Sequence, residues 1–388
     1  MSDDNVSEVS TQSWFSRIGD SIKGMLFGGV LAAVAVFVLF WNEGRAVRRA
    51  EALKEGGGAV VSVSAEKIDP ANEGKLVHLS GLATTTETLV DGEFGISTNV
   101  LKLRRVAEMY QWKETKSTSK EKNLGGSETT KTTYNYAQHW SESPIDSKQF
   151  KQPEGHTNPA SLPYASRSVT AEKITVGEFT LSGSLAAKIN NFTDLPVEQV
   201  EKLPEPVRAK AKLHEQKVYV GANPATPQVG DTRVGFKIAR PTVVSFIARQ
   251  IKGSFEPFAT RNGGEIELLQ TGEVSAQAMF QAAAEANAML TWILRAAGLI
   301  VMWIGFALIA KPLAVFGDLV PFIGSILEFG IGLLAFLLAG VISLLTVAIA
   351  WIVYRPVLGA ALIALAVALP FLVKRMRGGP KPAVPGAK

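Results

Sequence analysis

The sequence predicts an α+β membrane protein, with four transmembrane helices and a large β-rich extramembrane domain between the first and the second. Three observations support this fold class. Residues 329–354 are 26 residues without a charge, and a helix of that length, about 39 Å, outreaches a hydrocarbon core of roughly 30 Å. A second apolar block lies near the N-terminus, at residues 24–41. Between the two apolar regions, the chain has ordinary polarity and strand-like alternation.

Composition limits the classes of chemistry that the chain can perform. The 388 residues carry a formal net charge of +5 and include no cysteine. Disulfides and thiolate chemistry are therefore excluded. Much of the basic excess flanks the apolar segments, so membrane lipids explain it and we expect no nucleic-acid partner.

The N-terminal region predicts a tail followed by a membrane anchor. Residues 1–23 are polar and indicate a disordered cytoplasmic tail. Residues 24–41 predict transmembrane helix 1, with Trp41 as an interfacial anchor. The alternative is a cleaved signal peptide. The uncleaved helix is favoured because a long acidic tail precedes the apolar run, and because no small residues suited to cleavage follow it.

A charged segment rich in helix formers follows the first apolar run. Residues 42–55 (NEGRAVRRAEALKE) predict an extension of the helix out of the bilayer, ending at the glycines of residues 56–58. Arg45, Arg48 and Arg49 lie close together on successive turns, where they could meet lipid headgroups. A solvated helix face explains them equally well.

Residues 42–288 predict an extracytoplasmic α+β domain in which strands dominate. Strand patterns cover residues 60–63, 75–81, 101–112, 134–140, 173–181, 217–220, 233–238, 242–251 and 265–269, with short helices at 185–189 and 197–203. Residues 113–131 have little apolar periodicity and predict the mobile tip of a long hairpin. Alternating aromatic residues at 134–140 are more typical of a packed sheet face than of a ligand platform.

The second membrane helix is expected at residues 289–310, with Arg295 at the headgroup level, where its stem can snorkel. Residues 312–328 predict an interfacial or re-entrant helix. Phe316 lies on its apolar face, and Asp318 and Glu328 lie on its polar face.

Two further spans complete the predicted bundle, at residues 329–354 and 357–373. Arg355 would occupy the tip of a tight turn between them. The basic residues of the tail 374–388 place it in the cytoplasm by the positive-inside rule. Counting back through four spans puts the large domain outside, in the periplasm of a bacterium or the lumen of a eukaryote, and the N-terminus inside.

No catalytic, cofactor-binding or metal-binding residues are predicted. The four histidines, at 78, 139, 156 and 214, lack metal-ligand spacing, and the common hydrolase and phosphate-loop motifs are absent. We therefore expect a protein that is not an enzyme. Asp318, Glu328 and Arg355 are candidates for a function within the membrane, and positioning at the interface is the alternative.

The order of several motifs resembles the transmembrane protein 43 family, also called LUMA. The matching segments are residues 42–45 (NEGR), 72–81 (NEGKLVHLSG), 101–112 (LKLRRVAEMYQW), 155–159 (GHTNP), 229–235 (VGDTRVG), 246–250 (FIARQ), 291–298 (TWILRAAG) and 344–356 (LLTVAIAWIVYRP). They cover nearly the whole length. Short spans rich in alanine and glycine favour a bacterial member of the family, in an inner membrane with a periplasmic domain.

The resemblance implies four spans and a large domain between the first two. Animal members of the family are associated with the endoplasmic reticulum and the inner nuclear membrane, self-associate and help to organise membrane protein complexes. For this chain the resemblance therefore implies a scaffold and homo-oligomer, with membrane lipids and other membrane proteins as partners. An oligomeric channel or transporter and a lipid-interacting membrane organiser are the alternatives. The family supplies no catalytic residues to transfer.

Overall fold

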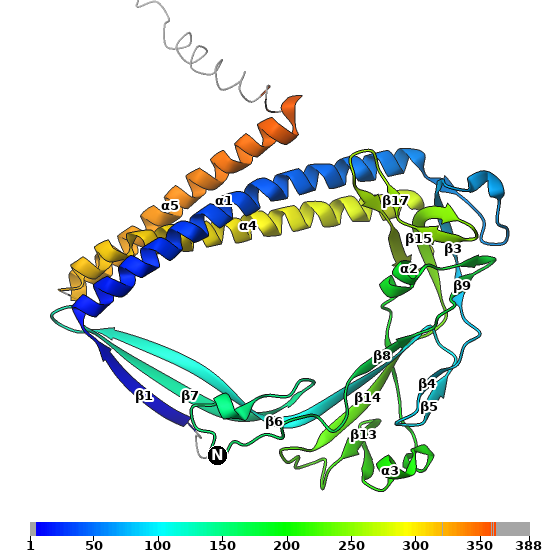
Figure 1. Cartoon of the computed structure of the whole chain (residues 1–388), viewed down its shortest axis with the longest axis horizontal. Coiled ribbons are helices and arrows are strands. Elements are labelled where there is room, and N and C mark those ends of the chain that lie inside the picture. The colour runs from blue at the N-terminus through cyan, green and yellow to red at the C-terminus, as the bar shows by residue number, and fades with distance from the viewer. Residues whose placement is uncertain (1–4, 320, 358, 360, 362–388) are drawn as a thin grey trace, which may run out of the picture. The chain divides into compact units, whose positions relative to one another are not determined.

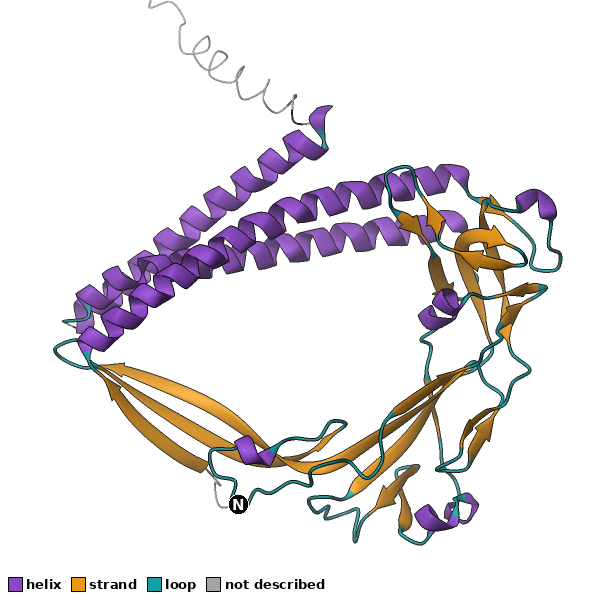
Figure 2. Cartoon of the chain, viewed as in Figure 1, coloured by secondary structure: helices purple, strands orange, loops and turns teal. Residues whose placement is uncertain are grey.

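A computed structural model describes residues 5–319, 321–357, 359 and 361. The chain divides into two compact units. The β unit comprises Ala52–Glu121, Thr129–Ala283 and the described residues up to Thr11. The helical unit comprises Gln12–Glu51, Lys122–Glu128 and the described residues from Ala284 onward. Figure 2 shows the strands and the long helices by colour.

The first sheet of the β unit has eight strands. Its main path is β1-β7-β6-β14-β13-β12, with β8 beside β6 and β11 beside β14. Burial alternates along β6 from Leu103 to Gln111, as expected for a strand with one face on a core. The bounds are β1 Asn5–Gln12, β6 Lys102–Lys122, β7 Glu128–Ser141, β8 Arg167–Thr170, β11 Thr193–Leu195, β12 Ala211–His214, β13 Lys217–Val220 and β14 Thr232–Ala239.

The second sheet has seven strands, in the order β10-β9-β3-β15-β16, with β19 beside β15 and β2 beside β3. The antiparallel pair β3–β15 sets Leu79 opposite Phe246, and both side chains are fully buried. The bounds are β2 Val61–Ser62, β3 Leu76–Thr84, β9 Thr175–Val176, β10 Phe179–Thr180, β15 Thr242–Ile251, β16 Ser254–Glu256 and β19 Leu268–Thr271.

Short elements complete the β unit. Two small hairpins pair β4 with β5 and β17 with β18. The remaining bounds are β4 Leu89–Asp91, β5 Ile96–Thr98, β17 Phe258–Ala259, β18 Glu265–Ile266, α2 Gly183–Lys188, α3 Glu205–Arg208, η1 Pro70–Asn72, η2 Ser147–Gln149 and η3 Val200–Lys202. A hydrophobic core joins residues of both sheets, among them Leu79, Phe236 and Phe246. The predicted β-rich α+β domain is therefore present.

The N-terminal residues differ from the sequence prediction. A disordered tail was expected over residues 1–23, but Asn5–Gln12 form β1, which pairs with β7. Side chains add contacts, since the Glu8 carboxylate and the Lys151 ammonium group form an ion pair at 2.8 Å. A polar strand without a core face gives no periodicity signal, and the free edge of β7 supplies its backbone partners.

The predicted mobile tip is also shorter than expected. Residues 113–131 were assigned to it, yet β6 continues to Lys122 and β7 begins at Glu128. The turn closes with a bond from the Asn123 amide to the Ser127 carbonyl at 2.8 Å. Gly125 and Gly126 have φ values of +82° and +80°, which favour glycine. Strand pairing here depends on backbone bonds between polar residues, which sequence periodicity does not report.

The helical unit contains α1 (Trp14–Ala59), α4 (Ala276–Gly317) and α5 (Pro321–Tyr354), drawn in Figure 1. In the described part of the chain, three helical stretches are long and apolar enough to cross a membrane: Trp14–Ala59, Ala276–Gly317 and Ile326–Tyr354. They support an integral membrane protein. The fourth predicted span, 357–373, and the basic tail 374–388 lie outside the described residues, apart from 357, 359 and 361.

Glycine permits the close approach of α1 and α4. A Cβ atom added to Gly28 would lie 2.5 Å from the carbonyl oxygen of Gly305, and one added to Gly305 would lie 2.8 Å from the carbonyl oxygen of Gly28. Small residues at such a crossing let two helix backbones touch, which is how membrane helices gain packing energy.

One expectation for the C-terminal region was wrong. Residues 312–328 do not form a helix of their own, because α4 continues through Pro312 to Gly317 and α5 begins at Pro321. The chain does turn sharply after α5, at Arg355. A Cβ atom added to Gly359 would lie 2.6 Å from the Cα atom of Ile352, a distance that a continuous helix does not allow for residues seven positions apart. A proline is compatible with a helix start, and inside a helix it removes only one bond.

The limits of α1 also differ from the prediction. Transmembrane helix 1 was expected at residues 24–41, with an extension stopped by the glycines at 56–58. Instead α1 begins at Trp14 and includes all three glycines before it ends at Ala59. Gly56 packs against Ile266 and Phe280 of the β unit, so tertiary packing overrides the low helix propensity of glycine.

Candidate functional site

A buried carboxylate organises one end of the helix bundle. Glu43 of α1 follows the apolar run of residues 24–41, and it is 0% exposed. Arg295 of α4 donates two hydrogen bonds to it, from Nε to Oε1 at 2.7 Å and from Nη2 to Oε2 at 2.8 Å. The indole Nε1 of Trp351 on α5 donates a third, at 2.8 Å. A buried charge is tolerated when it is paired and hydrogen-bonded in this way.

An amide and hydroxyl network continues the same polar layer between α1 and α4. The side chain of Asn42 donates to the carbonyl of Thr291 at 3.1 Å. Arg45 donates to Asn287 at 2.9 Å and to the Thr291 hydroxyl at 3.0 Å. We call this set the Glu43 cluster: Asn42, Glu43, Arg45, Asn287, Thr291, Arg295 and Trp351. It joins three helices through polar groups that a membrane-facing bundle keeps away from lipid.

Aromatic rings surround the arginines of this end of the bundle. The Arg295 guanidinium lies 4.7 Å from the ring centroid of Trp292 and 5.9 Å from that of Trp351. Arg355 lies 5.8 Å from the Trp351 centroid, on the same indole. Tryptophan and arginine together are typical of the membrane–water interface. The placement of Arg295 at headgroup level stays a prediction, and these rings are compatible with it.

An apolar groove adjoins the cluster. Its volume is about 520 Å³, and Leu39 of α1 contributes to its wall. Along α5 its lining follows one helical stripe from Gly340 to Trp351. Among the residues that the structure describes, Arg295 is the one charged residue that lines it.

A second polar group lies at the other end of α4, and we call it the Asp318 cluster: Arg17, Lys122, Glu128, Asp318 and Glu328. Asp318 is 1% exposed, and it pairs with Arg17 at 2.5 Å and with Lys122 at 2.8 Å. Lys122 also pairs with Glu328, at 2.5 Å. Burial lowers the pKa of Lys122, but its hydrogen bonds to Asp318 and Glu328 outweigh that effect and raise it.

The hairpin tip itself takes part in the Asp318 cluster. Arg17 donates to the carbonyl of Gly126 at 2.5 Å, and Trp14 donates to the carbonyl of Val315 at 2.9 Å. These contacts connect the start of α1, the end of α4 and the turn between β6 and β7. Arg17 and Lys122 each pair with two carboxylates of the cluster, which indicates a structural junction between segments distant in sequence.

The comparisons with known proteins agree with the resemblance of the motifs. The family model described as transmembrane protein 43 matches residues 109–356. This chain belongs to the transmembrane protein 43 family. It is 36% identical to the human transmembrane protein 43 over 383 residues, which cover 96% of this chain and 94% of that protein. It is 32% identical to the Drosophila melanogaster homolog, over 89% of this chain and 93% of that protein. No solved structure matches it significantly.

Three motif segments that carry the resemblance to the transmembrane protein 43 family meet in the Glu43 cluster. Residues 42–45 supply Asn42, Glu43 and Arg45, residues 291–298 supply Thr291 and Arg295, and residues 344–356 supply Trp351. They come from three helices that are far apart in the sequence. This convergence makes the Glu43 cluster the leading candidate functional site of this family member.

The predicted site residues divide between the two clusters. Arg45 and Arg295 belong to the Glu43 cluster, with Arg355 against Trp351, whereas Asp318 and Glu328 belong to the Asp318 cluster. The remaining predicted residues lie apart: Arg48 is exposed near the Tyr354 ring, Arg49 is half-buried, and Phe316 packs on Trp14 with ring centroids 5.8 Å apart.

Three residues of the two clusters were not predicted from the sequence as site residues: Glu43, Lys122 and Arg17. Glu43 carried one usable signal, because an acidic residue directly after an apolar run needs a cationic partner. Arg295, near the start of the second span, is a cation that could supply this partner. Lys122 carried no such signal, because it lies among polar residues of the hairpin and only the fold brings it to Asp318.

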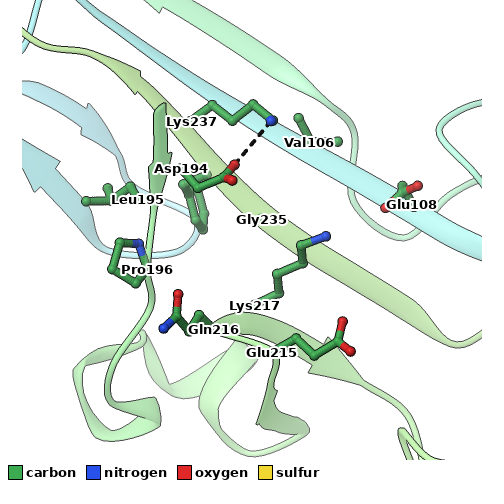
Figure 3. Close-up of a pocket in the computed structure, with 11 residues that line it drawn as sticks. Val106, Glu108, Asp194, Leu195, Pro196, Glu215, Gln216, Lys217, Gly235 and Lys237 are labelled. Carbon is green, nitrogen blue, oxygen red and sulfur yellow. Dashed lines mark ion pairs between the residues drawn. The ribbon is translucent and has the colours of Figure 1, made fainter. Parts of the chain in front are cut away.

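A charged hollow lies in the β unit. Its volume is about 190 Å³, and Figure 3 shows Asp194 and Lys237 directed toward one another, with an ion-pair distance of 3.1 Å. Lys217 and Glu215 lie on its rim. Among the described residues, no group of three or more His, Cys, Asp or Glu side chains could hold a metal ion. Exposed, mutually neutralised charges suit solvent better than a substrate.

Proposed function

We propose that this member of the transmembrane protein 43 family is a non-enzymatic membrane scaffold that self-associates through its β unit and organises membrane protein complexes. The observation that carries the proposal is how the β unit incorporates the membrane helices. Met279, near the start of α4, packs in a core with Leu76, Ile247 and Ile266. At the end of α1, Ala52 and Leu53 are 0% and 5% exposed. A domain built around the ends of two membrane helices is suited to holding partners at the membrane surface.

Self-association through the β unit has a candidate surface. Leu82 of β3 and Val243 of β15 are directly opposite in the antiparallel register. They are 52% and 38% exposed. Adjacent exposed aliphatic side chains on a sheet face favour contact with another apolar surface. We propose that a second copy of the chain covers this pair, with membrane lipids and other membrane proteins as the remaining partners.

The charge pairing gives less support to a channel or transporter. That alternative depended on the charged segment around Asp318 and Glu328. Both carboxylates are paired with Lys122, and Asp318 is also paired with Arg17. Paired carboxylates attract permeating cations less than an open ring of like charges does.

The test is the oligomeric state in a membrane-like environment. Native mass spectrometry of the full chain in nanodiscs should show dimers or larger assemblies. Leu82→Glu should shift the population toward monomers, because it places charge in the apolar contact. Val90→Glu is the control, since Val90 is also 52% exposed but belongs to β4. Monomers alone for the wild-type chain would refute the proposal.

A further inference from the structure

We propose that the apolar groove beside the Glu43 cluster binds one acyl chain of an anionic phospholipid, with the phosphate against Arg295 and Arg355. The proposal does not rest on the proposed self-association, because the groove is argued from α1, α4 and α5 themselves.

The chemistry of the groove matches an acyl chain. Leu39, Leu299, Leu344 and Val347 line it, and small residues such as Gly340 leave room between them. Its volume, about 520 Å³, falls within the roughly 300–1,000 Å³ range of ligand pockets in proteins. The groove lies on helices that are apolar enough to cross a membrane, where acyl chains are the surrounding solvent.

The length of the groove matches one leaflet. On α5 its lining extends from Trp351 to Gly340, a separation of about 16 Å along a helix axis. Half of a hydrocarbon core is roughly 15 Å. With Trp351 and Trp292 at the interface level, the groove extends to about the bilayer midplane, which is the depth of an acyl chain.

The charge at the interfacial end favours an anionic headgroup. Arg295 and Arg355 both lie against the Trp351 ring. Glu43 neutralises one positive charge by pairing with Arg295. The three groups together therefore retain one positive charge. Basic residues between membrane helices are a recurring way to bind acidic headgroups. An uncharged protein segment would make no use of this charge.

The test uses a glycine that opens into the groove. A Cβ added to Gly340 meets nothing within 4 Å, and Gly340 lines the groove, so Gly340→Leu should place a side chain in it. Gly330→Leu is the matched control, because Gly330 lies on the same helix, also meets nothing within 4 Å and does not line the groove. If Gly340→Leu fails to fold, Leu344→Trp fills the same space at a position that is 73% exposed.

The full chain would be reconstituted in nanodiscs of equal parts phosphatidylglycerol and phosphatidylcholine and released for native mass spectrometry. We expect one retained phosphatidylglycerol per chain, a loss of at least about fivefold in Gly340→Leu and no change in Gly330→Leu. Arg355→Gln should reduce the preference for phosphatidylglycerol over phosphatidylcholine. Equal retention in the two glycine variants would overturn the proposal, as would equal retention of the two lipids by the wild-type chain.

Cross-linking separates the lipid from a protein occupant. The chain has no cysteine, so Leu344→Cys introduces a single thiol into the groove. Ready formation of a disulfide-linked dimer would assign the groove to a second copy. A disulfide to a single cysteine placed within residues 357–373 would assign it to that segment. Either result would overturn the lipid proposal, which expects Leu344→Cys to remain unlinked.

Discussion

The carboxylate of Glu43 on α1 receives two hydrogen bonds from the guanidinium of Arg295 on α4, at 2.7 and 2.8 Å, and it is fully buried. Glu43 follows the apolar run of residues 24–41, and Arg295 lies near the start of the apolar run of residues 289–310. The pair therefore joins two helices that are about 250 residues apart in the sequence. Removing one member leaves the other as an uncompensated charge.

Arg295→Ala should destabilise the helical unit strongly. Breaking a buried pair by removing one partner costs about 3–5 kcal/mol in the free energy of unfolding. Chemical unfolding in detergent micelles, followed by tryptophan fluorescence, measures the change. The control is Arg261→Ala, since Arg261 is 94% exposed and lies 3.9 Å from Glu55. Such a surface pair contributes at most about 1 kcal/mol. Equal losses in the two variants would contradict the assigned role of the pair.

Gly28→Ala should separate α1 from α4. The added methyl group would lie 2.5 Å from the Gly305 carbonyl oxygen, so a backbone must shift, at a cost of about 1–3 kcal/mol. Gly29→Ala is the matched control, because a Cβ there meets nothing within 4 Å and alanine is the better helix former. Thermal unfolding in the same detergent compares them. A Gly28→Ala variant as stable as Gly29→Ala would show that the helices do not touch at this crossing.

The sequence predicted the parts of the fold that depend on local patterns. Apolar runs identified α1, α4 and α5, and β-branched alternation identified strands such as β15. The residues around Ser10 were assigned to a disordered tail and Lys122 to a mobile hairpin tip. Both assignments were wrong, because the strands that contain these residues have few apolar side chains and are held by backbone pairing. The Glu43 cluster could be predicted only in part. Arg45 and Arg295 were selected as interfacial charges, but their partners depend on how three helices pack.

Lys122→Ala should loosen the turn between β6 and β7. Lys122 bridges Asp318 and Glu328, at 2.8 and 2.5 Å, and its loss leaves both carboxylates with one partner fewer. Hydrogen exchange at residues 123–127 should accelerate by about tenfold, which corresponds to roughly 1.4 kcal/mol of lost protection. Lys148→Ala, at an exposed position, should leave exchange in the turn unchanged. Faster exchange in the control alone would refute the role of Lys122.

The attachment of β1 should weaken in acid. The hydrogen bond from Lys151 holds the pKa of the Glu8 carboxyl below its ordinary value of 4.5. A lowered folded pKa means that the stabilisation is complete above the ordinary value and is lost as pH falls through the lowered one. Protection factors of the amides in Asn5–Gln12 should therefore fall below pH 4.5. In Glu8→Gln they should not follow this titration. A wild-type profile identical to that of the variant would exclude Glu8.

The N-terminal strand makes a prediction about membrane topology. Because β1 pairs with β7, residues before α1 must lie on the same side of the membrane as the β unit. A complete crossing by α1 would place them on opposite sides, as the positive-inside count predicted. The pairing and a complete crossing therefore exclude each other, and the structure predicts the same side.

Single cysteines test this directly, since the chain has none of its own. Ser10→Cys lies before α1 and Lys67→Cys lies after it, both at exposed positions. In sealed vesicles, a membrane-impermeant maleimide should label both variants or neither, because they share one side. A cysteine appended after Lys388 shows the vesicle orientation of the C-terminus. Labelling of only one of the two flanking positions would mean that α1 crosses the bilayer completely. In that case β1 could not pair with β7 in the membrane-inserted protein, and the edge of β7 would be free to pair with another strand.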